Sequence, residues 1–436
     1  MPFHAPRWRF DVRIQPFHRI HPLPSRASTV SSPPYDVLTT AEAGELAEGK
    51  PESFLHVIRP EIDLPESTPW NDSNVYDKAA ENLLQFIESG VLQRDETPTI
   101  AIYRLSWEGR SQFGIVCTCH VDDYLQGIIK KHEETRPDKE DDRTRHLLAL
   151  DAHTGPLMLT FRDRDDITSQ LALDTTGRPD VHFKSTDGVT HTLWTVTDPQ
   201  PWIEAFASMP EAYIADGHHR AASAARAAAT RREECPDADD DAEFNWFLGV
   251  LFPASQLNVL AYNRVVTDLG SLTEEEFLER LSTIGRVERS AKSIPDRKGV
   301  FCLALPSGWH RLELDADPQA DPVARLDAAL LQDRVLGPIL GIDDPRTDSR
   351  LQFVGGIKGP EELMRRVEVG EATLGISMYP TSIDDMMAVS DAELSMPPKS
   401  TWFEPKLRSG LFLHAMDSAR YGENDDWVTW NWVALT

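Results

Sequence analysis

Five polar residues interrupt an apolar stretch near the middle of the chain, in the order Asp216, Gly217, His218, His219, Arg220. Apolar residues precede them, and an alanine-dominated run, 221–229, follows. Because alanine is the strongest helix former, this order predicts a strand, a turn and a helix, with Asp216 as the N-cap and Gly217 in the turn. The free N–H groups and positive dipole end of a helix start favour a bound anion. We therefore predict a phosphate site at residues 216–220.

The alternative is that Asp216 only caps a helix and that the next polar side chains are surface residues. Two histidines and an arginine at a helix N-terminus work against the helix dipole. This placement favours a functional role over capping alone.

A dense charged run, residues 130–146, forms a second group. Most mixed charge runs are solvated helices, and Pro137 argues against one continuous helix here. The functional alternative is a segment that supplies a general base, Glu133 or Glu134, together with side chains that bind phosphate or the nucleotide. These binding residues are Lys130, Lys131, His132, Arg143 and His146.

A third group lies in the proline-stiffened stretch 396–411. Lys399, Ser400 and Thr401 would form a preorganised, donor-rich loop that binds phosphate or carboxylate oxygens. The alternative is a surface loop anchored by its aromatic residues. The stretch contains no GxxxxGK[ST] phosphate loop, and the chain contains no GxGxxG.

Substrate contacts are predicted in two places. Pro33 and Pro34 fix an extended backbone that presents Tyr35 and Asp36 in a defined pose. Arg59 and Lys406 complete the predicted substrate-binding set.

Composition limits the class of protein. The chain has 436 residues, with 44 basic and 71 acidic side chains and a formal net charge of −27, which argues against broad nucleic-acid binding. No apolar run approaches the ~20 residues of a membrane helix, and the first thirty residues lack the apolar core of a secretory signal. The four cysteines form no CxxC pair. We expect a cytoplasmic protein with reduced, structural cysteines that binds neither nucleic acid nor membranes.

Strand and helix patterns alternate irregularly, which predicts an α+β fold with a mixed sheet and flanking helices. Strands are expected at 53–59, 100–107, 112–121, 245–252 and 374–379, and a helix with a capping box at 273–284. The predicted organisation is an N-terminal extension (1–15), an N-terminal α+β region (16–245), a C-terminal α+β region (246–415) and a tail (416–436).

Taken together, the three groups and the Pro33-Pro34-Tyr35-Asp36-Val37 run resemble the DUF1015 family of uncharacterised bacterial and archaeal proteins, from about residue 16 to 412. The Asp-Gly-His-His-Arg step is similar to the phosphate-binding element of the ParB/sulfiredoxin-like fold, which includes kinases that phosphorylate free serine. The resemblance implies that Asp216, His218, His219 and Arg220 bind phosphate and Mg²⁺, with Asp216 as the metal ligand. The catalytic cysteine of sulfiredoxin has no counterpart here.

We therefore expect Mg²⁺-dependent phosphoryl transfer between ATP or another nucleotide and a small hydroxyl metabolite, with free serine as the candidate. Arg220, the helix start and Lys399 would hold phosphate oxygens, and Glu133 or Glu134 would take the hydroxyl proton. Two alternatives stay open. One is a phosphatase with His218 or His219 as acid or nucleophile, and the other is a ParB-like nucleotide-binding regulator without turnover. A homodimer is also left open.

Overall fold

The computed structural model describes residues 11–290 and 292–417. They form two compact units. Unit 1 contains the chain up to Lys130, residues 135–256 and the chain from Pro405, and unit 2 contains Lys131–Glu134 and Leu257–Glu404. Most of the expected N-terminal extension and tail lies outside the described residues. In the part that the structure describes, no helix is both long and apolar enough to cross a bilayer.

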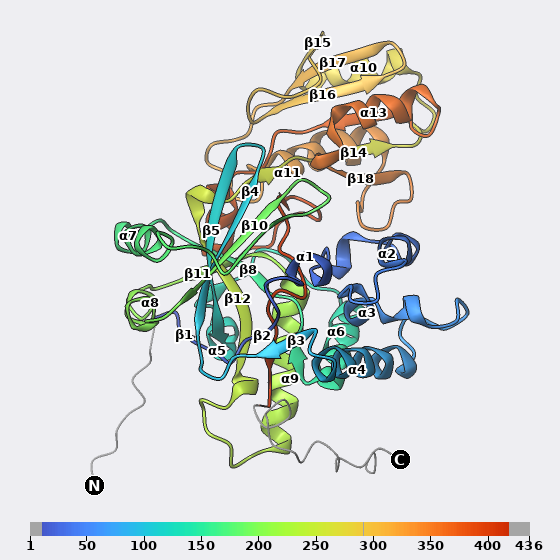
Figure 1. Ribbon diagram of the computed structural model, residues 1–436. Helices are drawn as coiled ribbons and strands as arrows, with labels where there is room; N and C mark the ends of the chain where they lie inside the picture. The colour runs from blue at the N-terminus through green and yellow to red at the C-terminus, as the bar shows by residue number, and fades with distance from the viewer. Residues whose placement is uncertain (1–10, 291, 418–436) are drawn as a thin grey trace. The chain divides into compact units, whose positions relative to one another are not determined.

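A large mixed sheet is the centre of unit 1 (Figure 1). β11 runs parallel to β6, and β12 runs parallel to β8, whereas the other pairs are antiparallel. In spatial order the strands are β6 (Ile129–Lys130), β11 (Ala212–Asp216), β8 (Leu157–Phe161), β12 (Trp246–Pro253), β5 (Arg110–His120), β4 (Ile100–Trp107), β10 (Thr190–Val196) and β9 (Val181–Lys184), with β1 (Ile14–Gln15) paired to β5. The predicted mixed sheet is confirmed.

One hydrophobic cluster joins this sheet to its helices. Alternate side chains of β4, β5, β8, β11 and β12 are buried in it, as the two-residue period of a strand requires. The helices that contribute to the cluster are α5 (Val121–Leu125), α7 (Asp165–Asp174), α8 (Gln200–Phe206) and α9 (His218–Glu234). α9 packs through small alanine side chains, which allows it to lie close to the sheet.

A second group of helices in unit 1 packs around α6 (Pro137–Leu150), which begins at Pro137. Figure 1 shows α6 beside α9, with α4 (Ser73–Glu88) next to it. The expected strand at 53–59 is wrong, because this segment contains the helix α3 (Leu55–Ile58). Its run of apolar residues is buried throughout, and such a short run does not distinguish a strand from a helix.

Short elements complete unit 1. They are α1 (Ala27–Val30), α2 (Thr40–Ala47), the 3₁₀ turns η1 (Tyr35–Val37), η2 (Pro60–Asp63), η3 (Glu243–Asn245) and η4 (Ala254–Gln256), and the strand pairs β2 (Ile20–Pro22) with β3 (Leu92–Arg94) and β7 (Ala152–His153) with β21 (His414–Ala415).

Unit 2 is built on an antiparallel sheet in the order β15 (Arg286–Arg289), β17 (Gly308–Glu313), β16 (Val300–Leu305), β19 (Leu374–Ser377), β14 (Tyr262–Val266) and β18 (Leu351–Gly355). Along β16, Phe301 and Leu303 join the cluster that contains α10 (Glu274–Ile284), whereas Ala304 joins the cluster of α13 (Gly359–Glu368). Helices therefore cover both faces.

The remaining elements of unit 2 are short. They are α11 (Asp327–Leu331), the π-helical turn η5 (Gln332–Leu336), α12 (Gly337–Leu340), the 3₁₀ turn η6 (Gly356–Lys358), α14 (Ile383–Asp391), and the strand pair β13 (Val259–Leu260) and β20 (Trp402–Phe403). The predicted capping box of α10, between Thr273 and Glu276, is present.

The two units divide the chain differently from the regions expected at 16–245 and 246–415. β12 begins at Trp246 but pairs with β5 and β8, so the division falls after Gln256. The chain then returns to unit 1 at Pro405, and β21 pairs with β7. The predicted regions were continuous in sequence, whereas unit 1 takes a strand pair from the end of the described chain.

Candidate functional site

The turn between β11 and α9 differs from the predicted one at its cap. β11 ends at Asp216, and Gly217, with a φ of 102°, is the N-cap of α9. No side chain caps the helix, so the prediction that Asp216 is the N-cap is wrong. A Cβ atom at Gly217 would lie 2.9 Å from Nε and 3.0 Å from Cζ of Arg220. The Arg220 guanidinium is therefore folded back over the glycine.

The carboxylate of Asp216 is compensated by two cations. Its Oδ2 atom lies 3.2 Å from Nζ of Lys406 and 3.7 Å from Nη2 of Arg220. Burial alone would raise the pKa of Asp216, but the charges of Lys406 and Arg220 outweigh burial and lower this pKa to about 2. Asp216 is thus ionised at neutral pH. A Mg²⁺ ion on this oxygen would have to displace one of the two cations, so Asp216 fits the metal only with a rearrangement.

One N–H group of the Arg220 side chain has no hydrogen-bond acceptor among the described residues. Its Nη1 donates to the carbonyl of Pro156, and its side chain is 12% exposed. The buried Nε atom has no acceptor among the residues that the structure describes. Burial alone would lower the pKa of Arg220, but Asp36, Asp216 and Tyr35 raise it. An anion beside Arg220 would supply the missing acceptor through a charge-assisted hydrogen bond.

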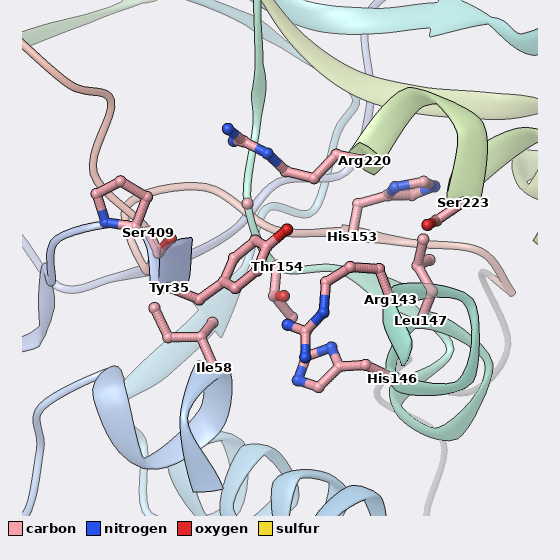
Figure 2. A pocket seen from close by; sticks show the side chains of 12 residues that line it. Tyr35, Ile58, Arg143, His146, Leu147, His153, Thr154, Arg220, Ser223 and Ser409 are labelled. Atoms are coloured by element: carbon pink, nitrogen blue, oxygen red, sulfur yellow. The ribbon is translucent and has the colours of Figure 1, made fainter. Parts of the chain in front are cut away.

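A small cavity adjoins Arg220 (Figure 2). In Figure 2, Arg220 enters from the start of α9 and Arg143 from α6, with the ring of Tyr35 between them in this view. The guanidinium of Arg143 lies 4.3 Å from the centre of that ring and 2.7 Å from the carboxylate of Asp142. The cavity, which is partly open to solvent, has a volume of about 40 Å³. A space of this size holds roughly three water molecules, and therefore a single small oxyanion.

The other groups around the cavity are mostly uncharged. Burial raises the pKa of Tyr35 to about 12 and lowers the pKa of His146 to about 4, and burial also holds the pKa of His153 well below its usual range. Nε2 of His146 donates to the carbonyl of Val57 at 3.0 Å. His146 is therefore neutral at pH 7, and the cations of the cavity wall are Arg143 and Arg220. The remaining lining residues are Pro34, Ile58, Leu147, Thr154, Gly155, Ser223 and Ser409.

Two predicted residues of unit 1 have structural partners. Arg59 donates to the carbonyl of Tyr35 at 3.0 Å and pairs with Glu61 at 2.8 Å, so it holds the loop that carries Tyr35. His219 accepts the backbone N–H of Arg136, the N-cap residue of α6, at its Nε2 atom, 3.1 Å away. His218 is buried at the start of α9.

Lys130, at the end of β6 in unit 1, pairs with Glu211. The remaining predicted residues belong to unit 2, and their part in the site stays a prediction. Glu134 accepts from Ser395 at 2.7 Å, and the carbonyl of His132 accepts the N–H of Met396 at 2.8 Å. Hence the segment Lys131–Glu134, which includes Glu133, is tied to the stretch that leads to Lys399, Ser400 and Thr401.

Ser223 and Ser409 were missed as cavity residues. Ser223 follows Arg220 by three residues on α9 and so lies on the same face of the helix. That helical spacing could have identified it. Ser409 stands in the proline-rich stretch, but nothing in the sequence links it to Arg220.

Solved structures resemble this chain only with low TM-scores and low sequence identity. A free serine kinase in complex with AMP is 12% identical, with a TM-score of 0.33, over 66% of this chain and 86% of that chain. SbnI with a C-terminal truncation, from Staphylococcus aureus, is 12% identical, with a TM-score of 0.37, over 72% and 91%. A conserved hypothetical protein from Pyrococcus furiosus is 12% identical, with a TM-score of 0.34, over 69% and 95%.

A search of the curated proteins found no match. A family model described as "Protein of unknown function (DUF1015)" matches residues 14–329, which is more than half of the chain. The chain therefore belongs to the DUF1015 family.

Proposed function

We propose that the protein binds the phosphate groups of ATP or another nucleotide at the start of α9 and, with Mg²⁺, transfers a phosphoryl group to a small hydroxyl metabolite, with free serine as the candidate acceptor. The observation that supports this proposal is the arrangement of Arg220. Its guanidinium is folded over Gly217, has an unused Nε–H and borders an oxyanion-sized cavity that Arg143 also lines.

Phosphoryl transfer requires the positioning of two reactants and the neutralisation of phosphate charge more than a reactive nucleophile. Arg220 and the free N–H groups at the start of α9 would neutralise that charge. In this proposal Asp216 exchanges a cation partner for Mg²⁺ when the nucleotide binds. Glu133 or Glu134 takes the proton of the acceptor hydroxyl. Lys399, Ser400 and Thr401 bind phosphate oxygens in unit 2.

The test is a product assay. The purified protein is incubated with ATP, Mg²⁺ and L-serine, and ADP and phosphoserine are measured by mass spectrometry. We expect both products from the wild type and at least a ~100-fold lower rate from Arg220→Met, because one charge-assisted contact in a transition state contributes about 2.7–4 kcal/mol. Arg226→Met is the matched control, because Arg226 lies on the exposed side of the same helix. Replacing Glu133 and Glu134 by Gln, one at a time, identifies the base.

Absence of ADP across a panel of small hydroxyl acids would contradict the kinase. Nucleotide binding without turnover would then favour the regulator. Release of inorganic phosphate from phosphoserine, without nucleotide, would favour the phosphatase. The bond from the Arg136 N–H already occupies Nε2 of His219, which makes His219 a weaker candidate for the phosphatase nucleophile.

A further inference from the structure

Unit 2 contains a buried cation that has no counterion among the described residues. Arg264, on β14, is 3% exposed. Its guanidinium donates to the carbonyl of Tyr262 and lies 3.5 Å from the carbonyl of Pro398 and 4.9 Å from the centre of the Phe353 ring. Within the described residues, no carboxylate pairs with it. Burial lowers the pKa of Arg264 to about 10, as expected for a cation that carbonyl dipoles and a ring compensate only in part.

The loop that contacts Arg264 carries unused donors. Pro397 and Pro398 stiffen it, and Lys399 adopts a left-handed backbone conformation with a φ of 58°. Pro398 and Lys399 form a hydrogen-bonded turn that joins Pro397 to Ser400, whereas the backbone N–H groups of Lys399 and Thr401 have no backbone acceptor within the described part of the chain. Free N–H groups beside a left-handed residue can contribute to an anion site. They are independent of the Arg264 side chain and provide the same kind of contact.

Other contacts hold this loop in place. The hydroxyl of Ser400 donates to the carbonyl of Pro397 at 2.7 Å, and Thr381 donates to the carbonyl of Ser400 at 2.8 Å. The exposed ammonium of Lys399 lies 5.7 Å from the centre of the Tyr262 ring. Because these contacts use the carbonyls and the hydroxyl, the backbone N–H groups of Lys399 and Thr401 remain available, and the loop has little entropy to lose when a ligand binds.

We propose that Arg264, Lys399 and the backbone N–H groups of Lys399 and Thr401 form a binding site for a small anion with phosphate or carboxylate oxygens. The inference rests on the proposed phosphate-binding role of Lys399, Ser400 and Thr401 and adds Arg264, which lies beneath the loop. All of these groups are donors, and two of them, Arg264 and Lys399, are cationic, so they suit an oxyanion and not a metal ion. The bound anion supplies the counter-charge that Arg264 lacks.

A purely structural role for Arg264 makes a different prediction. If carbonyl and ring contacts satisfied this side chain, an apolar residue of similar length would only lose those contacts. Under the proposal, the same replacement removes an uncompensated buried charge, so the free energy of unfolding in anion-free buffer stays the same or rises. The replacement also abolishes the stabilisation that the bound anion gives the wild type.

The experiment measures the thermal midpoint of the full-length protein during titration with inorganic phosphate, at constant ionic strength maintained with sodium chloride. We expect phosphate to stabilise the wild type, with at least ~10-fold weaker apparent affinity for Arg264→Met, since a hydrogen bond to a charged group contributes about 1.5–3 kcal/mol. Arg286→Met, at an exposed arginine of the same unit, should respond like the wild type. A response of Arg264→Met equal to that of the wild type would overturn the inference.

Two additions keep the result decisive. Lys399→Met changes an exposed side chain and should also weaken phosphate binding, so it replaces Arg264→Met if that variant does not fold. Parallel titrations with acetate identify the ligand class, because the stronger of the two responses shows whether phosphate or carboxylate oxygens are preferred.

The outcome also separates this inference from the proposed function. If Arg220→Met abolishes phosphate binding and Arg264→Met does not, the inference fails while the proposed function stands. If Arg264→Met weakens phosphate binding but no phosphoryl transfer is measured, the anion site stands without the kinase.

Discussion

Arg220 of unit 1, whose side chain is 12% exposed, and Arg264 of unit 2, which is 3% exposed, differ in how their charge is compensated. Arg220 of unit 1 lies 3.7 Å from the carboxylate of Asp216, with Asp36 as a second negative charge that raises its pKa. Arg264 of unit 2 has carbonyl groups and a ring as partners, and its pKa is lowered. Burial alone acts on both in the same direction, so nearby carboxylates decide the opposite outcomes.

This difference separates two ways of preparing a site for an anion. In unit 1 the cations are held in place by a carboxylate, and an incoming phosphate must compete with Asp216 for them. In unit 2 no carboxylate competes, so an anion adds the only full negative charge among the described partners of Arg264. We therefore expect unit 1 to depend strongly on Asp216 for stability and unit 2 to depend on the ligand.

The largest expected effect is that of Asp216→Asn. The change leaves Lys406 and Arg220 without their shared counterion, and removing one partner of such a pair costs about 3 kcal/mol in the free energy of unfolding at pH 7. Urea denaturation measures this loss. Asp141→Asn, at a half-exposed carboxylate of α6, is the control and should cost less than about 0.5 kcal/mol.

The pH dependence of the same pair gives a second check. The pKa of Asp216 is about 2 in the folded protein and 3.8 ordinarily. A lowered folded pKa stabilises the protein above the unfolded value, and this contribution is lost as pH falls from about 4 to about 2. The difference between wild type and Asp216→Asn should therefore shrink over that range. A constant difference would show that Asp216 is not held ionised by Lys406 and Arg220.

The next effect is the contrast between the two arginines in anion-free buffer. Arg220→Met should lower the free energy of unfolding because Asp36 and Asp216 lose a counter-charge, whereas Arg264→Met should leave it unchanged or raise it. We expect the two variants to differ by about 2 kcal/mol in urea denaturation. Equal losses in both would mean that the partners of Arg264 compensate its charge fully.

A smaller effect is expected for Gly217→Ala. The φ of 102° strains an alanine, and its Cβ would lie 2.9 Å from Nε of Arg220, so the guanidinium must move. Gly109→Ala is the matched control, because Gly109 has a φ of 78° and open space at its Cβ position. We expect Gly217→Ala to cost about 1.5 kcal/mol more than Gly109→Ala, and to weaken nucleotide binding in calorimetry. Equal costs and unchanged nucleotide binding would show that Arg220 need not fold over Gly217.

Local sequence rules predicted the elements better than the contacts between them. The strand before Gly217 and the alanine-rich helix after it depend on neighbouring residues, as does the capping box of α10, and all three are present. The role of Asp216 as N-cap was wrong because Lys406, which is 190 residues away in sequence, takes its carboxylate instead. Propensity carries no information about a partner at that separation.

The same limit explains why the sequence did not identify Arg264 as a candidate binding residue. In sequence it is one residue of an apolar strand, and an alternating pattern shows only that its side chain lies on one face. Its lack of a carboxylate partner depends on which side chains of β18 and of the loop 396–401 lie beside it. Similarly, Arg59 was predicted to bind substrate, and this role stays a prediction; its pairing with Glu61 and its bond to the carbonyl of Tyr35 were not evident from the sequence.

The smallest predicted effect concerns His219 and tests whether it acts on chemistry or on α6. Its Nε2 atom accepts the N–H of Arg136, where α6 begins, and Arg143 lies two turns along this helix. His219→Ala removes one acceptor at a helix end and should cost about 0.5–1 kcal/mol in urea denaturation. His219→Gln can offer a side-chain oxygen to the same N–H but cannot act as an imidazole base. Recovery of both stability and product formation by His219→Gln would assign His219 to positioning α6, and recovery of stability alone would assign it to the chemistry.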